Sequence, residues 1–285
     1  MLSLDRMVME PMENAKPLDA PFKRWKDNDA LLYRGAVSVL ASAPGQGKTI
    51  TALNVVNNIE VPTLYFSNDS TKYTILSRAF SLLSEQDISI SREIIETRPE
   101  VASRVLRRWR RVKWDFNTRP TVQEIALHGD AFRELYGEYP HLVIVDILMN
   151  VDHEGISEQN FWKIFPELKE MAGDWQSAFL VVHHTSEAHK GNPCPPSAAI
   201  MGKANQLPEL IITQAIQGDK VHYAVVKNRN GASDPSGETS FTQPIEPSKF
   251  KVREAPPEVE LKFHDGPNVP AHKKINPQDQ EEEEW

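Results

Sequence analysis

Short apolar runs alternate with amphipathic stretches through the middle of the chain. The runs AVSVLA, TLYFS, HLVIVDIL and AFLVVHH are separated from one another by segments in which apolar residues recur at helical spacing. Runs of consecutive apolar residues indicate strands buried on both faces of a sheet. Strands that alternate with helices predict βαβ units, and hence a mostly parallel sheet with helices on both faces.

The pattern changes after the last of these runs. Three strand-like segments, LIITQAI, VHYAVVKN and TSFTQP, follow at short spacing and predict antiparallel strands closing one edge of the sheet. The chain is therefore expected to hold one α/β domain over residues 31–247. Residues 1–30 are polar and contain several prolines, which predicts an N-terminal arm or linker, and residues 248–285 predict a disordered acidic C-terminal tail.

Charge is distributed unevenly along the chain. The net charge is −8, and residues 251–285 hold five Lys or Arg against nine Asp or Glu, so about half of the net negative charge lies in the tail. This balance argues against a protein that coats duplex DNA by bulk electrostatics, although it leaves room for a local basic channel. The terminal EEEEW is interpreted as a solubilising run, with docking on a basic groove or partner as alternatives.

Other features narrow the class of protein. With Cys194 as the single cysteine, an internal disulfide and a cysteine-based zinc cage are excluded. Cys194 is interpreted as a small residue in a proline-rich loop rather than as a nucleophile. No run approaches the roughly 18 apolar residues of a membrane span, and the N-terminus lacks the apolar core of a signal peptide. We therefore expect a cytoplasmic protein without a membrane partner.

A phosphate-binding loop follows the first predicted strand. The strand, residues 36–41, leads directly into SAPGQGKT, and a helix with one apolar face follows. This is the context that a Walker A motif requires, because its glycines let backbone N–H groups surround a phosphate at the start of a helix. The sequence departs from the motif at Ser42, which stands in place of the first glycine.

The loop assigns specific roles. The amine of Lys48 is expected to neutralise the β- and γ-phosphates of ATP, while the hydroxyl of Thr49 binds Mg²⁺. Asp146 ends the run HLVIVD, at the edge of a parallel sheet where ligands bind, and is expected to be the second Mg²⁺ ligand. The expected nucleotide-binding residues are Ser42, Ala43, Pro44, Gly45, Gln46, Gly47, Lys48, Thr49 and Ile50.

Beyond these motifs, three segments resemble RecA-fold ATPases, specifically the branch of DnaB-type replicative helicases and plasmid RepA-like hexameric helicases. They are LLYRGAVSVLASAPGQGKTITALNVV, FLVVHHTSEA and YAVVKNRNGA, and the resemblance extends over residues 31–242. It implies an ATPase that acts on single-stranded DNA as a hexameric ring or filament. Replication or recombination proteins are the implied partners.

The resemblance also implies roles for particular residues. His184 would sense the γ-phosphate, with a satisfied pair of histidines, His183 and His184, as the alternative. Lys227 and Arg229 would reach into the neighbouring subunit's site, with a solvated basic edge as the alternative. Asp69 stands where DnaB-type members place the glutamate that activates water, and its shorter side chain predicts slow hydrolysis.

Three stretches are candidates for contact with DNA. Residues 186–203 and 150–160 are expected to form loops near the axis of a ring or filament. Residues 101–114, VASRVLRRWRRVKW, carry six positive charges and no acid, with Trp109 and Trp114 interleaved. Basic residues and aromatic rings together suit a single strand, whereas a helix face packed by its tryptophans is the alternative.

Three functions fit these observations. The first is a ring helicase that translocates on single-stranded DNA. The second is a recombination or strand-annealing ATPase that assembles on single strands without unwinding them. The third is an ATP-switched binding or loading protein in which slow hydrolysis times an interaction. The KNRNG segment favours the first, and Asp69 together with the short N-terminal region favours the other two.

Overall fold

The fold is known from a computed structural model that describes residues 16–154, 160–186 and 194–256. The chain separates into a large unit, Met1–Ala255, and a small one, Pro256–Trp285. All the helices and strands described below belong to the large unit. Most of the predicted acidic tail, and parts of both predicted DNA loops, lie outside the described residues.

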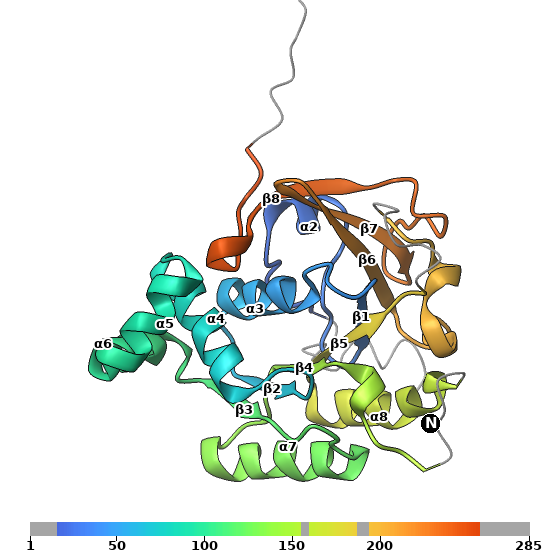
Figure 1. The fold of residues 1–285 in the computed structure, drawn as a ribbon. Coiled ribbons are helices and arrows are strands. Elements are labelled where there is room, and N and C mark those ends of the chain that lie inside the picture. The colour runs from blue at the N-terminus through green and yellow to red at the C-terminus, as the bar shows by residue number, and fades with distance from the viewer. Residues whose placement is uncertain (1–15, 155–159, 187–193, 257–285) are drawn as a thin grey trace, which may run out of the picture. The chain divides into compact units, whose positions relative to one another are not determined.

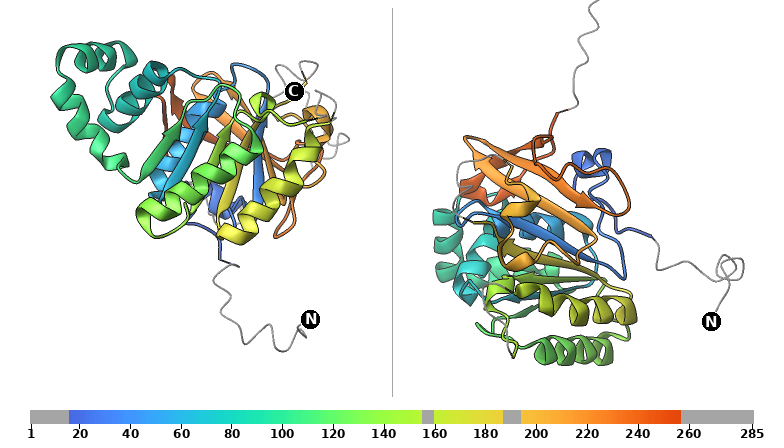
Figure 2. Two further views of the ribbon diagram at one scale, coloured as in Figure 1. Left: turned by 90° about the horizontal axis from the view of Figure 1, so that it is seen from below. Right: turned by 90° about the vertical axis from the view of Figure 1, so that its right-hand side faces the viewer.

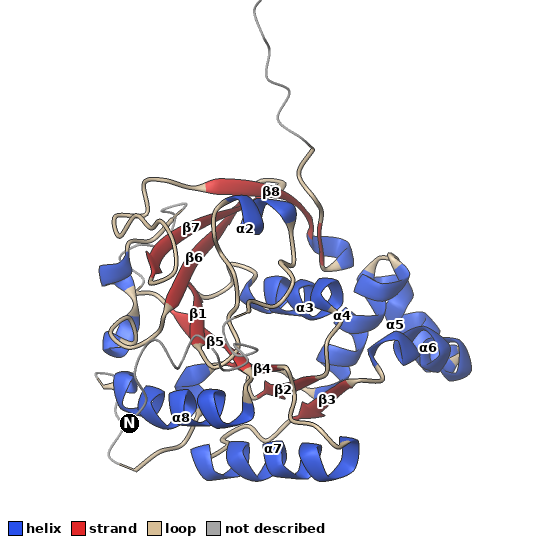
Figure 3. Ribbon diagram, turned by 180° about the vertical axis from the view of Figure 1, so that it is seen from behind, coloured by secondary structure: helices blue, strands red, loops and turns tan. Residues whose placement is uncertain are grey.

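The centre of the large unit is a sheet in which the described residues contribute nine strands in the order β3-β2-β4-β5-β1-β6-β7-β8-β9 (Figures 1 and 3). The strands from β3 to β6 run parallel, and β7, β8 and β9 are antiparallel to their neighbours. The strands are β1 (Val37–Ser42), β2 (Thr63–Ser67), β3 (Val112–Asp115), β4 (Leu142–Asp146), β5 (Ala178–His184), β6 (Leu210–Gln217), β7 (Lys220–Asn228), β8 (Phe241–Glu246) and β9 (Lys251–Val252).

Helices cover both faces of this sheet. Helices α3 and α4 pack on one face, α7 and α8 pack on the other, and α5 and α6 lie beyond the β3 end (Figures 1 and 2). The helices are α2 (Lys23–Asp27), α3 (Lys48–Ile59), α4 (Lys72–Ser84), α5 (Ile88–Thr97), α6 (Pro99–Leu106), α7 (Val122–Tyr136) and α8 (Phe165–Trp175). Each face buries its own apolar cluster, so the central strands are apolar on both sides.

The predicted α/β class, the mostly parallel sheet and the antiparallel edge are confirmed, with one refinement. Strand β6 pairs parallel with β1 on one side and antiparallel with β7 on the other, so the antiparallel part begins one strand later than expected. The prediction also missed β3. The basic stretch 101–114 is not one element, because α6 ends at Leu106, a 3₁₀ turn covers Arg107–Trp109 and β3 begins at Val112.

The core extends past the predicted bounds of the domain, 31 and 247, on both sides. Phe22, Trp25 and Ala30 are buried, and the Trp25 ring meets the Tyr223 ring edge-on with their centroids 5.4 Å apart. At the other end, Val252 of β9 is buried in the same cluster. The polar composition of residues 16–30 conceals a few well-spaced apolar side chains, and these anchor the segment to α3 and β7. Within the described residues, none of the helices is both long and apolar enough to cross a membrane.

Two helical glycines predict opposite responses to the same substitution. A Cβ on Gly129 of α7 would overlap the Trp175 ring, whereas a Cβ on Gly173 of α8 would meet no atom within 4 Å. We expect Gly129→Ala to lower the free energy of unfolding by about 1–3 kcal/mol through overpacking. Gly173→Ala should raise it by up to about 1 kcal/mol, because alanine is the better helix former. Urea denaturation measures both, and equal effects would contradict the close packing of α7 on α8.

Candidate nucleotide-binding site

The sequence-predicted site residues converge where the parallel strands end. The phosphate loop follows β1, Asp69 lies two residues after β2, Asp146 ends β4 and His184 ends β5. Register places Ser42 beside His184 and Asp146 beside Val182 on neighbouring strands. The carboxyl edge of the sheet, where open α/β folds bind ligands, therefore holds all four elements.

The loop has the backbone geometry that its glycines predict. Gly45 and Gly47 have φ of 77° and 75°, a left-handed conformation that glycine adopts without cost, and α3 begins immediately afterwards. Gln46 fastens the loop to β6, because its carbonyl accepts from Gln214 Nε2 at 2.6 Å and its Oε1 accepts from the Ile216 N–H at 2.8 Å. A Cβ on Gly47 would lie 2.5 Å from Ile216 Cδ1, so a larger residue would also have to displace the end of that side chain.

The Lys48 amine is buried inside the loop. Nζ donates to the carbonyl oxygens of Ser42 at 3.1 Å and Ala43 at 3.0 Å, and it lies 3.1 Å from His184 Nδ1. Burial lowers the pKa of Lys48 to about 8, against the opposing effect of Asp146 and Asp69. The amine thus remains protonated at neutral pH. Loop carbonyl groups thus supply two of its hydrogen-bond partners.

Thr49 and Asp146 form the pair expected for Mg²⁺. The Thr49 hydroxyl donates to Asp146 Oδ2 at 3.0 Å, and Tyr65 of β2 donates to the same oxygen at 2.8 Å. Burial raises the pKa of Asp146, and these two donors together with Lys48 oppose the rise. One hydroxyl and one carboxylate oxygen suit Mg²⁺, which is usually held by few protein ligands together with phosphates. Among the described residues no group of three or more His, Cys, Asp or Glu could hold a metal by itself.

The two histidines differ in environment. His183 is fully buried, its Nε2 lies 3.0 Å from the Met201 carbonyl oxygen, and its ring meets the Phe161 ring edge-on. Burial lowers the pKa of His183 to about 4, so this ring is a neutral core residue. His184 is half-buried, and its pKa is also lowered by burial and then by Lys48. A neutral His184 whose Nδ1 accepts from Lys48 leaves Nε2–H as a donor.

Three side chains at this edge are missed by sequence analysis. Tyr65 contacts Asp146 as described above. Asn68 joins the ends of β2 and β4, because its Oδ1 accepts from the Ile147 N–H and its Nδ2 donates to the Ile147 carbonyl at 3.0 Å. Arg78 of α4 is half-buried, and burial lowers its pKa, whereas the nearby Asp146, Tyr65 and Asp69 favour its charged form. No motif marks these residues, since only the packing of β2, β4 and α4 brings them together.

Asp69 itself is exposed, and it lies near enough for its negative charge to favour the charged forms of Lys48 and Arg78. It belongs to the loop before α4, whose first turn is capped by the Thr71 hydroxyl accepting from the Thr74 N–H. The neighbouring Asn68 fixes the backbone of this loop against β4. Asp69 is therefore an accessible carboxylate on an anchored segment.

Lys227 and Arg229 lie away from the phosphate loop of their own chain. Lys227 Nζ donates to the carbonyl oxygens of Asn205 at 2.9 Å and Gln206 at 2.7 Å, so its amine is engaged within the chain. The Arg229 N–H donates to the Glu209 carbonyl, and the Glu209 N–H donates to the Val37 carbonyl. Arg229 is thus level with the first residue of β1, and its side chain is exposed. The phosphate loop starts at Ser42, five residues beyond Val37 along β1, which is about 17 Å at a rise of 3.3 Å per residue.

The predicted DNA-contacting stretches are only partly described. Residues 155–159 and 187–193, with Lys190, lie outside the described residues, whereas Lys203 lies in a turn with φ of 56°. In the basic stretch, Trp109 is buried, and Trp114 is partly buried and stacks on Tyr65 with centroids 4.6 Å apart. These rings are parts of the core, so the expectation that they stack on bases is wrong for Trp109. The exposed residues of the turn are arginines.

Comparison with known proteins gives two kinds of similarity. No protein-family model matches the chain. The Gene 65 protein of Mycobacterium phage L5 is 30% identical over 218 residues, which is 73% of this chain and 81% of that protein. The Gene 65 protein of Mycobacterium phage D29 is 31% identical over 219 residues, or 70% of this chain and 90% of that protein.

Solved structures are similar in fold. One, described as an ATPase domain, has a TM-score of 0.71 at 14% identity, covering 89% of this chain and 96% of its own. A DnaB-like replicative helicase, described with its interactions with primase, has a TM-score of 0.71 at 13% identity, covering 90% of this chain and 68% of its own. These similarities confirm the RecA-like fold and the resemblance to DnaB-type ATPase domains.

His183 predicts a pH dependence of stability. Its pKa is lowered to about 4 in the folded protein, from an ordinary value of 6.5. As pH falls between these values, the unfolded chain binds a proton that the folded chain does not, so stability is lost. We expect the free energy of unfolding to fall by about 2 kcal/mol between pH 7 and pH 5 on this account. Urea denaturation of His183→Gln beside wild type isolates this term, and equal pH slopes would contradict the assignment.

Proposed function

We propose that this chain, which belongs to the family of mycobacteriophage Gene 65 proteins, is a Mg²⁺-dependent ATPase that drives movement along single-stranded DNA. The observation that carries the proposal is the 3.0 Å contact between Thr49 and Asp146, beside a buried Lys48, at the carboxyl edge of a parallel sheet. A phosphate loop, a hydroxyl and a strand-end carboxylate are the elements that P-loop ATPases use.

Each element of the loop has a role in binding. Bound ATP supplies the scissile phosphate bond, and Mg²⁺ neutralises phosphate charge. The loop presents the N–H groups of α3's first turn, and Lys48 exchanges the carbonyl oxygens of Ser42 and Ala43 for phosphate oxygens. Thr49 and Asp146 would hold the cation. Tyr65 keeps Asp146 oriented through its 2.8 Å hydrogen bond to Oδ2.

Asp69 is the proposed general base. It lies on the loop that Asn68 anchors, it is accessible, and it is close enough to Lys48 to act on its charge. Arg78 lies near Asp69 and Asp146 from the side of α4, and we assign it the stabilisation of negative charge that builds up during turnover. Both roles require that α4 keep its position against the P-loop helix α3.

His184 is suited to sense the nucleotide. Its Nδ1 lies 3.1 Å from the Lys48 amine, so a change in the position of this amine on nucleotide binding would be felt directly by the His184 ring. The segment that follows β5 leads to the proposed DNA loop, residues 186–203. In this proposal His184 couples the phosphate loop to the segment that we assign to DNA contact.

The active site is proposed to be shared between subunits of a ring or filament. Arg229 is exposed and lies about 17 Å, measured along the strands, from its own phosphate loop. This separation favours insertion into a neighbouring subunit's site, while Lys227 donates to the Asn205 and Gln206 carbonyl oxygens of its own chain. The structural likeness to a solved ATPase domain and to a DnaB-like replicative helicase supports a motor. The exposed, short carboxylate of Asp69 favours an ATP-switched binding protein as the second candidate.

Two substitutions separate binding from hydrolysis. Asp69→Asn removes the proposed base but leaves the phosphate loop intact, so ATP binding should persist while turnover falls by about 10²–10⁴-fold. Lys48→Ala removes the cation between the β- and γ-phosphates and should abolish turnover and weaken binding. Fluorescent-nucleotide titration and phosphate release measure the two properties. Wild-type turnover in Asp69→Asn would mean that another residue is the general base. Substantial turnover in Lys48→Ala would refute the assignment of residues 42–49 as the phosphate loop.

Mixing of variants tests the shared site. An arginine finger is typically worth about 10³-fold or more in rate, so Arg229→Ala should be nearly inactive alone, as should Lys48→Ala. When the two are combined, some interfaces pair an intact loop with an intact finger, and partial turnover should return. Mass measurement must show that mixed oligomers form. A mixture that stays inactive in spite of this, or a fully active Arg229→Ala protein, would rule out a finger supplied by the neighbour.

A further inference from the structure

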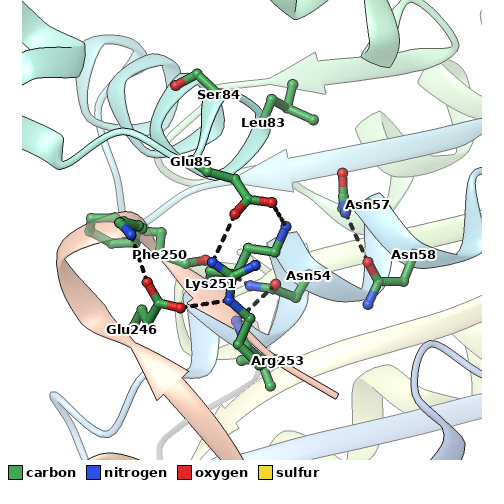
Figure 4. Close-up of polar contacts among 12 residues, drawn as sticks. Asn54, Asn57, Asn58, Leu83, Ser84, Glu85, Glu246, Phe250, Lys251 and Arg253 are labelled. Carbon is green, nitrogen blue, oxygen red and sulfur yellow. Dashed lines mark hydrogen bonds and ion pairs between the residues drawn. The ribbon is translucent and has the colours of Figure 1, made fainter.

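A strap of residues 247–254 follows β8 and joins two helices of the nucleotide site (Figure 4). On α3, both polar atoms of the Asn54 side chain form hydrogen bonds with the backbone of the strap. Asn54 Nδ2 donates to the Phe250 carbonyl at 2.8 Å, and the Val252 N–H donates to Asn54 Oδ1 at 3.0 Å. The strap is therefore fixed to the helix whose first turn carries Lys48 and Thr49.

The same strap is fastened to the end of α4. Glu85, which follows that helix, accepts from Lys251 Nζ at 2.7 Å and from Arg253 Nη2 at 2.8 Å, as Figure 4 shows. Ser248 Oγ also donates to Asp87 Oδ1 at 2.7 Å. Exposed ion pairs are individually weak, but the shared carboxylate and the backbone bonds to Asn54 act together. The strap thus sets how α3 and α4 lie relative to one another.

Phe250 occupies the centre of this strap in an unusual conformation. Its φ is 51°, in the left-handed region that a bulky residue adopts only when its surroundings require it. Its half-buried ring lies 5.2 Å, measured to the ring centroid, from the guanidinium carbon of Arg78. An arginine over an aromatic face is attracted by the ring's quadrupole, more strongly when water is partly excluded.

On the side away from Phe250, Arg78 lies next to the nucleotide site. Arg78 Nη1 donates to Ser70 Oγ at 3.3 Å, next to Asp69, and both Asp69 and Asp146 act on its charge. A long side chain with several rotatable bonds needs such a support to hold one orientation. We propose that Phe250 is a positioning residue that holds Arg78 toward Asp69 and Asp146, so that the C-terminal strap sets the rate of turnover. This rests on the proposed ATPase function.

The test compares ring and aliphatic side chains at position 250. Phe250→Leu keeps an apolar side chain but removes the ring, and we expect kcat to fall about two- to tenfold with little change in KM for ATP. Phe250→Trp should restore kcat, because its larger ring attracts a cation at least as well. In an Arg78→Ala background, Phe250→Leu should cause no further loss. Lys249→Ala, which removes only the surface pair with Glu246, is the matched control and should leave turnover unchanged.

A second measurement tests the contact without relying on turnover. Urea unfolding of wild type, Phe250→Leu, Arg78→Ala and the double variant should give losses in unfolding free energy that do not add, because the residues interact. Additive losses would overturn the contact, and non-additive losses with unchanged kcat would overturn the positioning role. A wild-type protein that matches Lys48→Ala in having no turnover would refute the ATPase proposal itself, and the positioning role with it.

Discussion

The buried charge of Lys48 is the constraint on which the rest of the site depends. An ammonium group loses its water when buried and must find other partners, or its pKa falls until it is neutral. Here two loop carbonyls and the neutral His184 ring supply those partners, and the pKa stays near 8. The left-handed Gly45 and Gly47 create the loop that aims these groups inward. In the proposed function, phosphate binding would exchange the partners of a charge that is already buried.

The same constraint explains the neighbouring residues. Asp146 is buried too, and the hydrogen bonds from Thr49 and Tyr65, together with the charge of Lys48, favour its charged form against the effect of burial. Asn68 fixes the turn after β4, and Arg78 adds a second cation from α4. The parallel sheet supplies the framework, since it brings the ends of β1, β2, β4 and β5 to one edge. The C-terminal strap completes the framework by joining α3 to α4.

Much of the fold and part of the site can be predicted from the sequence, because both depend on local signals. The apolar runs mark buried strands, and the phosphate loop is a contiguous motif, so Lys48, Thr49 and Asp146 can be identified and lie together. Tyr65, Asn68 and Arg78 cannot be identified in this way, since their partners are distant in sequence. In the basic stretch, residues 101–114, a local signal is misleading. Its composition indicates a nucleic-acid surface, but its two tryptophans pack inward against Tyr65 and one another. There a few apolar side chains decide the structure, while the average composition indicates exposure.

The proposed motor couples ATP turnover to movement on single-stranded DNA. The most direct measurement is strand displacement from a forked duplex, recorded beside phosphate release with and without single-stranded DNA. A motor of this kind predicts ATP-dependent displacement by wild type, none by Lys48→Ala, and turnover that rises when single-stranded DNA is added. Turnover that is indifferent to DNA, with no displacement at any protein concentration, would contradict a motor and leave an ATP-switched binding protein.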